Sequence, residues 1–74
     1  MNATELAKLQ IFLRQRFNDD TLTVRARTNK DDSAEVYIGE EFVGVLFKDE
    51  DEGEVSYDFN MAILELDLPE GGSA

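Results

Sequence analysis

The sequence contains no cysteine and no histidine. Without cysteine the chain can form neither disulfides nor thiolate metal sites. Without histidine it lacks the commonest metal ligand and the commonest general base of proteins. Catalysis by Ser-His-Asp or Cys-His arrangements is therefore excluded, and we expect no catalytic residue, no metal site and no cofactor. The sequence predicts a protein that is not an enzyme.

Long apolar runs and basic side chains are also scarce. The longest apolar stretches, "FVGVLF" and "MAIL", are too short to cross a bilayer. The first residues, "MNATELAKLQ", lack the basic region and apolar run of a signal peptide. Seven Lys and Arg residues stand against seventeen Asp and Glu residues, a net charge of −10. Without a signal peptide or a membrane-length apolar run, we expect a cytoplasmic protein. Because the negative charge repels phosphate, we expect it to bind neither nucleic acid nor membranes.

The length of 74 residues predicts one domain, which we place at residues 1–68, with a flexible C-terminal tail at 69–74. A chain this short buries only about 60–65% of the surface that its unfolded form exposes. Because disulfides and metals are absent, good packing or self-association must provide the stability.

The first segment has the pattern of a helix. Asn2 can cap it, with Glu5 completing a capping box. An apolar stripe at helical spacing consists of Leu6, Leu9, Leu13 and Phe17. The turn-forming residues of "FNDD" then end the helix.

From residue 21 the apolar residues alternate with a period of two, which predicts strands at 21–27, 34–38, 41–47 and 54–60. A polar loop is expected at 28–33 and a type II′ turn at Gly39–Glu40. The run "MAILELDL" at 61–68 slips in phase, which predicts a bulge or bend near residues 61–63, with a short helix over 60–66 as the alternative. The sum is an α+β fold, in which a helix packs on one face of a four-stranded antiparallel sheet in α-β-β-β-β order.

The stretch "KDEDEGEV" concentrates acids around Gly53. It fails as a calcium loop, because counting from Asp49 places the glycine fifth and Asn60 twelfth. A solvated hairpin turn is the favoured interpretation, and mimicry of nucleic acid and a weak cation site are the alternatives. The candidate acidic contact consists of Asp49, Glu50, Asp51, Glu52 and Glu54.

Both faces of the third strand are apolar. Val43, Val45 and Phe47 alternate with Phe42 and Leu46, and Tyr37 joins the second set if the turn at 39–40 fixes the register. One helix can cover one face only, and an uncovered apolar patch marks an interface. The alternative is that sheet twist and a bent last strand bury both faces. The candidate interface consists of Ile11, Phe12, Tyr37, Phe42, Val43, Val45, Leu46 and Phe47.

Basic residues of the first strand, Arg25 and Arg27, are expected to face acids such as Glu35 across the sheet.

The stretches "KLQIFLRQRF" and "SAEVYIGEEFVGVLFKDEDEGEVSYDFNMAILELDL" resemble a family of short acidic alphaproteobacterial proteins known only as a domain of unknown function. The resemblance covers about residues 5 to 68, and its most specific parts are "EVYIGEEFVGVL", "DEDEGE" and "MAILELDL". It implies a bacterial, cytosolic, stand-alone domain and assigns no activity.

The resulting hypothesis is a small non-enzymatic protein–protein interaction module that acts as a homodimer. The hypothesis also allows for an unidentified protein partner. An acidic antagonist of a basic partner and a weak divalent-cation-binding module are the alternatives.

Overall fold

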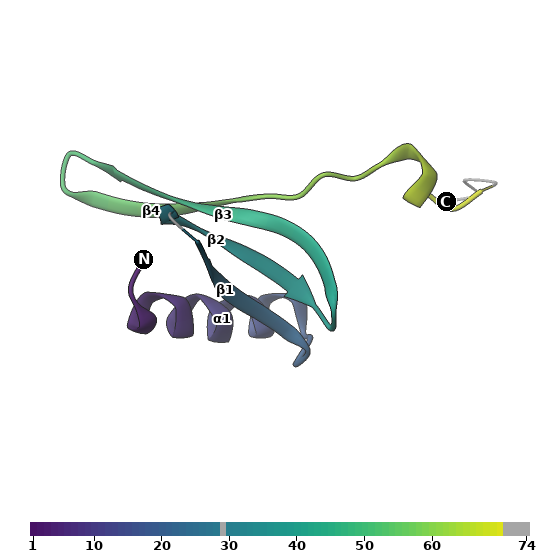
Figure 1. Cartoon of the computed structure of the whole chain (residues 1–74), viewed down its shortest axis with the longest axis horizontal. Coiled ribbons are helices and arrows are strands. Elements are labelled where there is room, and N and C mark those ends of the chain that lie inside the picture. The colour runs from purple at the N-terminus through teal and green to yellow at the C-terminus, as the bar shows by residue number, and fades with distance from the viewer. Residues whose placement is uncertain (29, 71–74) are drawn as a thin grey trace.

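Figure 1 shows the computed structural model of the chain, which describes residues 1–28 and 30–70, with the backbone alone at 30 and 31. A helix is followed by four antiparallel strands in the order β1-β2-β3-β4, which confirms the predicted α+β fold. The elements are α1 (Ala3–Phe17), β1 (Leu22–Arg27), β2 (Lys30–Ile38), β3 (Glu41–Asp51), β4 (Glu54–Asn60) and a 3-10 helix η1 (Glu65–Asp67). The predicted tail at 69–74 lies outside the described residues from residue 71 onward.

Helix α1 begins and ends as its sequence predicts. The side chain of Asn2 accepts a hydrogen bond from the N–H of Glu5 at 2.8 Å, and the Glu5 carboxylate accepts one from the N–H of Asn2 at 3.1 Å. This reciprocal pair is a capping box. At the other end Asn18 takes the left-handed conformation, with φ of 52°, and closes the last turn.

Two strands, β2 and β3, are longer than predicted, and β3 continues to Asp51 instead of ending at Phe47. β2 begins at Lys30 instead of Ala34, because its backbone pairs with β1 and β3 beyond that point. The expected loop at 28–33 is therefore much shorter. β4 occupies residues 54–60, as predicted. The run at 61–68 neither continues it as a bent strand nor forms the alternative helix over 60–66.

A β-bulge in β3 decides which side chains face α1. Val36 pairs with Gly44, whereas the next residue, Tyr37, pairs with Phe42. Val43 is therefore the extra residue, and the alternation of β3 flips at this point. As a result Leu46 points to the helix side, while Val45 and Phe47 point away from it.

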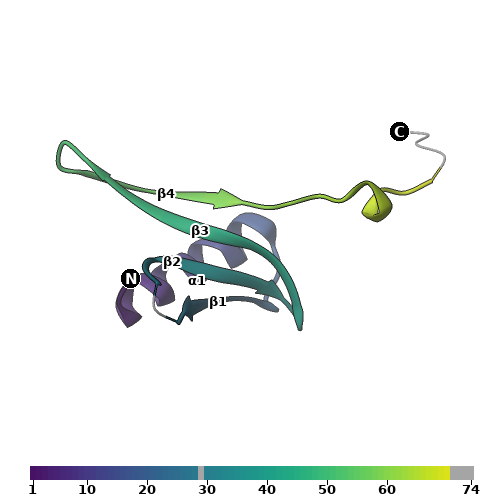
Figure 2. The same ribbon diagram turned by 45° about the horizontal axis from the view of Figure 1, so that its top comes forward.

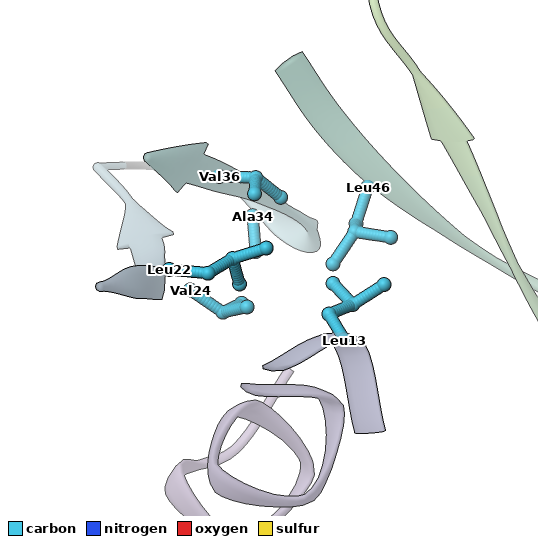
Figure 3. Packing of buried hydrophobic residues seen from close by; sticks show 6 residues of the cluster. All are labelled: Leu13, Leu22, Val24, Ala34, Val36 and Leu46. Atoms are coloured by element: carbon cyan, nitrogen blue, oxygen red, sulfur yellow. The ribbon is translucent and has the colours of Figure 1, made fainter. Parts of the chain in front are cut away.

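The core lies between α1 and the sheet, and α1 packs chiefly against β1 (Figures 1 and 3). Its buried apolar side chains are Leu13, Leu22, Val24, Ala34, Val36 and Leu46. Leu22 and Val36 are the largest fully buried ones. Half-buried side chains, among them Leu6, Leu9 and Phe59, complete the layer.

Candidate protein-interaction surface

Side chains of α1 close the free edge of β1. The side-chain oxygen of Gln10 accepts a hydrogen bond from the N–H of Val24 at 3.1 Å, and Nε of Arg14 donates to the carbonyl of Leu22 at 2.7 Å. An unpaired strand edge is a template for association with another chain, and these bonds occupy its backbone groups at Leu22 and Val24. The opposite edge of the sheet and the face turned away from α1 remain accessible.

The face turned away from α1, which we call the open face, combines a basic rim on β1 with an aromatic centre. Its residues are Thr23, Arg25, Arg27, Ser33, Glu35, Tyr37, Phe42, Val45 and Phe47. The rings of Tyr37 and Phe42 meet edge to face with centroids 5.7 Å apart. The Arg25 guanidinium lies 4.0 Å from the centroid of Tyr37, a cation–π contact. A row of contacts thus links the rim to Phe42.

The predicted charge pairing across β1 and β2 forms only in part. Arg25 and Glu35 are register partners, as expected. However, the Glu35 carboxylate accepts a hydrogen bond from the Tyr37 hydroxyl at 3.0 Å, which raises the pKa of that phenol. Among the side chains that the structure describes, Arg25 and Arg27 have no carboxylate at ion-pairing distance. Their guanidinium groups instead contact Thr23, Tyr37 and Ser33.

The predicted interface residues fall into three groups. Those that are exposed are Ile11 (57%), Phe12 (51%), Phe42 (50%) and Phe47 (42%). Tyr37 and Val45 are half-buried on the open face, and half-buried Val43 packs against the core. The inclusion of Leu46 in the candidate interface is wrong: it is buried, with 2% exposure, because the bulge turns it inward.

An apolar segment that the predicted interface omitted follows β4. Residues 61–68, which we call the C-terminal segment, run away from the sheet in both views (Figures 1 and 2). Its exposed apolar side chains are Met61 (51%), Ile63 (63%), Leu64 (55%), Leu66 (84%) and Leu68 (55%). The signal for it was in the sequence: an apolar run whose phase does not fit the preceding strand.

A solvent-open hollow of about 1140 Å³ lies between this segment and the first half of β3. Phe42, Val45 and Phe47 line it from the open face, and Met61 and Leu64 line it from the segment. Because β4 pairs with β3 only from Val45 onward, residues 41–44 have no strand beside them on this edge within the described chain. The hollow thus joins an apolar surface to an unpaired backbone edge.

A smaller hollow of about 460 Å³ lies beside α1, where the helix leaves the inner side of β4 partly uncovered. Phe12, Phe17 and Phe59 line it, and the rings of Phe17 and Phe59 meet edge to face at 6.3 Å. The Arg16 guanidinium lies 5.3 Å from the centroid of Phe12. Ring contacts within the chain already use much of this surface.

A polar cluster fastens the start of α1 to β3 and β4. One oxygen of Glu5, Oε2, lies 2.7 Å from Nζ of Lys48 and accepts the hydroxyl hydrogen bond of Tyr57 at 2.8 Å. The Lys48 ammonium, aided by the Asn2 N–H and the Tyr57 hydroxyl, lowers the pKa of Glu5 from 4.5 to about 2. The same bonds raise the pKa of Lys48 and of Tyr57. This cluster holds the hairpin of β3 and β4 against the helix.

The acidic stretch forms the far end of the β3–β4 hairpin. Its turn consists of Glu52 and Gly53, with φ of 50° and 83°, so the prediction of a tight turn is confirmed. Asp49, Glu50 and Asp51 belong to β3 and are exposed, and Glu50 lies 3.4 Å from Lys48. Among the described residues no group of three or more acids could hold a metal ion.

The fold and the surface together define a small α+β domain, with a helix on one face of a four-stranded antiparallel sheet and an apolar, accessible opposite face. Residues 5–67 match the family described as protein of unknown function (DUF3126), and the chain belongs to this family. The predicted resemblance to an uncharacterised family is thereby confirmed.

Comparison with curated proteins finds no match, and comparison with solved structures finds none either. Within the described residues, no helix has the length and apolar character needed to span a membrane.

Proposed function

We propose that this protein is a small non-enzymatic interaction module that acts as a homodimer through the open face of its sheet. The observation that carries the proposal is the exposure of Phe42 and Phe47, 50% and 42%, beside Tyr37 and Val45 on a face that no other element of the described chain covers. Contiguous apolar patches of this kind mark interaction sites in small proteins. A second copy is the simplest partner, because a two-fold contact uses the same patch twice.

The size of the chain supports self-association. A domain of 74 residues has little core, and here the fully buried side chains of the described residues come from one thin layer between α1 and the sheet. Covering the open face would add a second apolar layer. The absence of histidine and cysteine supports a role in contact and not in catalysis.

Sedimentation from micromolar to millimolar concentrations tests the proposal, with the Phe42→Glu variant beside the wild type. We expect a dimer for the wild type and a monomer for the variant, because the new carboxylate would be buried unpaired in the interface. The matched control is Val55→Glu, since Val55 is equally exposed at 50% but lies at the acidic hairpin. A wild type that stays monomeric at every concentration contradicts the proposal.

A contact with a basic protein, in the manner of an acidic antagonist, is a second candidate. The β3–β4 hairpin projects beyond the rest of the sheet (Figures 1 and 2) and carries its acids exposed. Such a contact gains from electrostatic attraction, so it should weaken steeply as salt rises. Competition between this protein and DNA for a basic protein, measured at low and high salt, tests it. Competition that does not respond to salt counts against this candidate.

A further inference from the structure

We propose that the C-terminal segment of each copy covers the open face of the other copy, so that the dimer forms by a reciprocal exchange of residues 61–68. This inference rests on the proposed homodimer and names the part of the second copy that occupies the surface. The binding site for that segment, which we call the seat, is the hollow beside β3 together with the basic rim of the open face.

The C-terminal segment is not buried by its own chain. All ten residues from 61 to 70 are exposed, and Leu66, at 84%, is the most exposed large apolar side chain that the structure describes. From Leu64 to Leu68 apolar residues alternate with Glu65 and Asp67. A segment that carries both apolar and acidic side chains suits a surface that offers apolar and basic groups together.

The seat offers both kinds of group. Its apolar part is the wall of the 1140 Å³ hollow that Phe42, Val45 and Phe47 form. Its basic part is the rim of Arg25 and Arg27, which is connected to Phe42 through the ring of Tyr37 in the row of contacts described above. The segment carries acids and no base, so its charge complements the basic rim, whereas the charged residues that line the hollow itself, Glu41 and Asp67, are acidic.

The position of the segment favours a second copy over its own chain as the seat. The segment follows Asn60, the last residue of β4, whose register partner is Val45, and then departs from the sheet (Figures 1 and 2). To cover its own open face it would have to bend back over β3 after Asn60. In a two-fold pair, by contrast, each segment enters the partner's hollow in its observed direction and lies beside the partner's own segment.

The available area is that of a stable dimer. A half-exposed Leu, Met or Phe side chain presents roughly 80 Å² of apolar surface. Five such side chains in the segment and two on the open face, Phe42 and Phe47, supply roughly 1,100 Å² in two copies. The smaller exposed parts of Tyr37 and Val45 bring the total to about 1,200 Å². Specific interfaces bury about 1,200–2,000 Å² in total.

The test uses the full-length chain with Leu64→Asp and Leu66→Asp combined, which we call the segment variant. These side chains are 55% and 84% exposed, so the isolated copy should fold unchanged, which circular dichroism checks. We expect the dimer dissociation constant from sedimentation to rise at least about a hundredfold, because two carboxylates would be buried in an apolar seat. The matched control is Ile11→Asp, at 57% exposure on α1, which should leave the dissociation constant unchanged.

Mixing two defective chains gives the sharper result. The Phe42→Glu chain has a damaged seat and an intact segment, and the segment variant has the reverse. In a reciprocal exchange the mixed dimer keeps one intact seat with one intact segment. Native mass spectrometry should therefore show a mixed dimer that is at least about tenfold tighter than either variant with itself.

Each further outcome is decisive. If the segment variant still dimerises like the wild type while Phe42→Glu is monomeric, the exchange is overturned and the open-face homodimer stands. If mixing yields no mixed dimer, or Ile11→Asp alone abolishes the dimer, the exchange is likewise overturned. A wild type that is monomeric throughout removes the proposed function itself.

Discussion

Replacing Gly44 by alanine should destabilise the protein, because the added methyl group has no space. A Cβ at this position would lie 2.5 Å from the backbone oxygen of Asn60 and 2.5 Å from Cε1 of Phe59. The ring could turn aside, but the carbonyl belongs to the last residue of β4, which pairs with Val45. Moving that carbonyl therefore means opening the end of the β3–β4 ladder. A glycine inside a strand often marks such a close approach.

The expected loss is about 1–2 kcal/mol. Overpacking a filled site costs typically about 1–3 kcal/mol. Alanine recovers roughly 0.5–1 kcal/mol of this, since glycine loses more backbone freedom on folding. For a domain of this size about 1 kcal/mol shifts the melting temperature by roughly 4–8 °C, so a fall on the order of 5–15 °C is expected.

Thermal denaturation at one fixed protein concentration measures the effect, and Gly53 provides the comparison. Gly53 has no heavy atom within 4 Å of its Cβ position, but its φ is 83°. Gly53→Ala should therefore lose stability through backbone strain, and Gly53→Asn should lose less, because asparagine tolerates the left-handed region. Gly44→Asn should be at least as harmful as Gly44→Ala. An unchanged melting temperature for Gly44→Ala would refute the close packing of β4 on this residue.

Three further changes test the fold. Leu22→Ala removes a core side chain that is 1% exposed and should lower the free energy of unfolding in urea by about 2–5 kcal/mol; a loss below about 1 kcal/mol would contradict its place in the core. Asn2→Ala removes the cap of α1 and should cost about 0.5–2 kcal/mol in the same assay, whereas Asn2→Asp should cost little. Glu5 has a pKa of about 2 in the folded chain against an ordinary 4.5, so its contribution is complete above pH 4.5 and is lost as the pH falls towards 2. The stability difference between wild type and Glu5→Gln should therefore shrink between pH 5.5 and pH 2, and a constant difference would show that Glu5 is not held in its ionised form.

Much of the fold could be predicted because local signals agree with it. Asn2 and Glu5 form their capping box. Gly39 and Gly53 have positive φ, and both hairpin turns lie at the predicted positions. Alternation then identified each strand. These features depend on residues that are close in sequence, so a pattern can reveal them.

The orientation of β3 could not be predicted in this way. A two-residue turn at 39–40 with unbroken alternation would place Val45 and Phe47 in the core and Leu46 outside. The bulge at Val43 reverses this arrangement, because it places Gly44, which can accommodate the ring of Phe59, on the helix side. The fit between Gly44 and Phe59 involves two strands, and no local pattern encodes it.

The ion-pair partner of Glu5 could not be predicted from the sequence either. Lys48 is the only base after residue 30, which marks it as a candidate for an ion pair, but fourteen acids follow residue 30 and three precede it. The sequence alone gives no reason to choose Glu5. The choice follows from the length of β3, which carries Lys48 to the start of α1.

The width of one helix explains why a polar contact between Glu5 on α1 and the β3–β4 hairpin is needed. A helix with its side chains is about 10 Å across and strands are spaced about 4.8 Å apart, so α1 can cover about two of the four strands. It lies over β1, whose edge it also closes, and this leaves β4 at the margin of its reach. The inner side of β4 is therefore held by individual contacts, from Glu5 to Tyr57 and from Phe17 to Phe59. A second copy that covers the open face would contact the same hairpin from the other side. Dimer formation and the pairing of β4 with β3 should therefore stabilise one another.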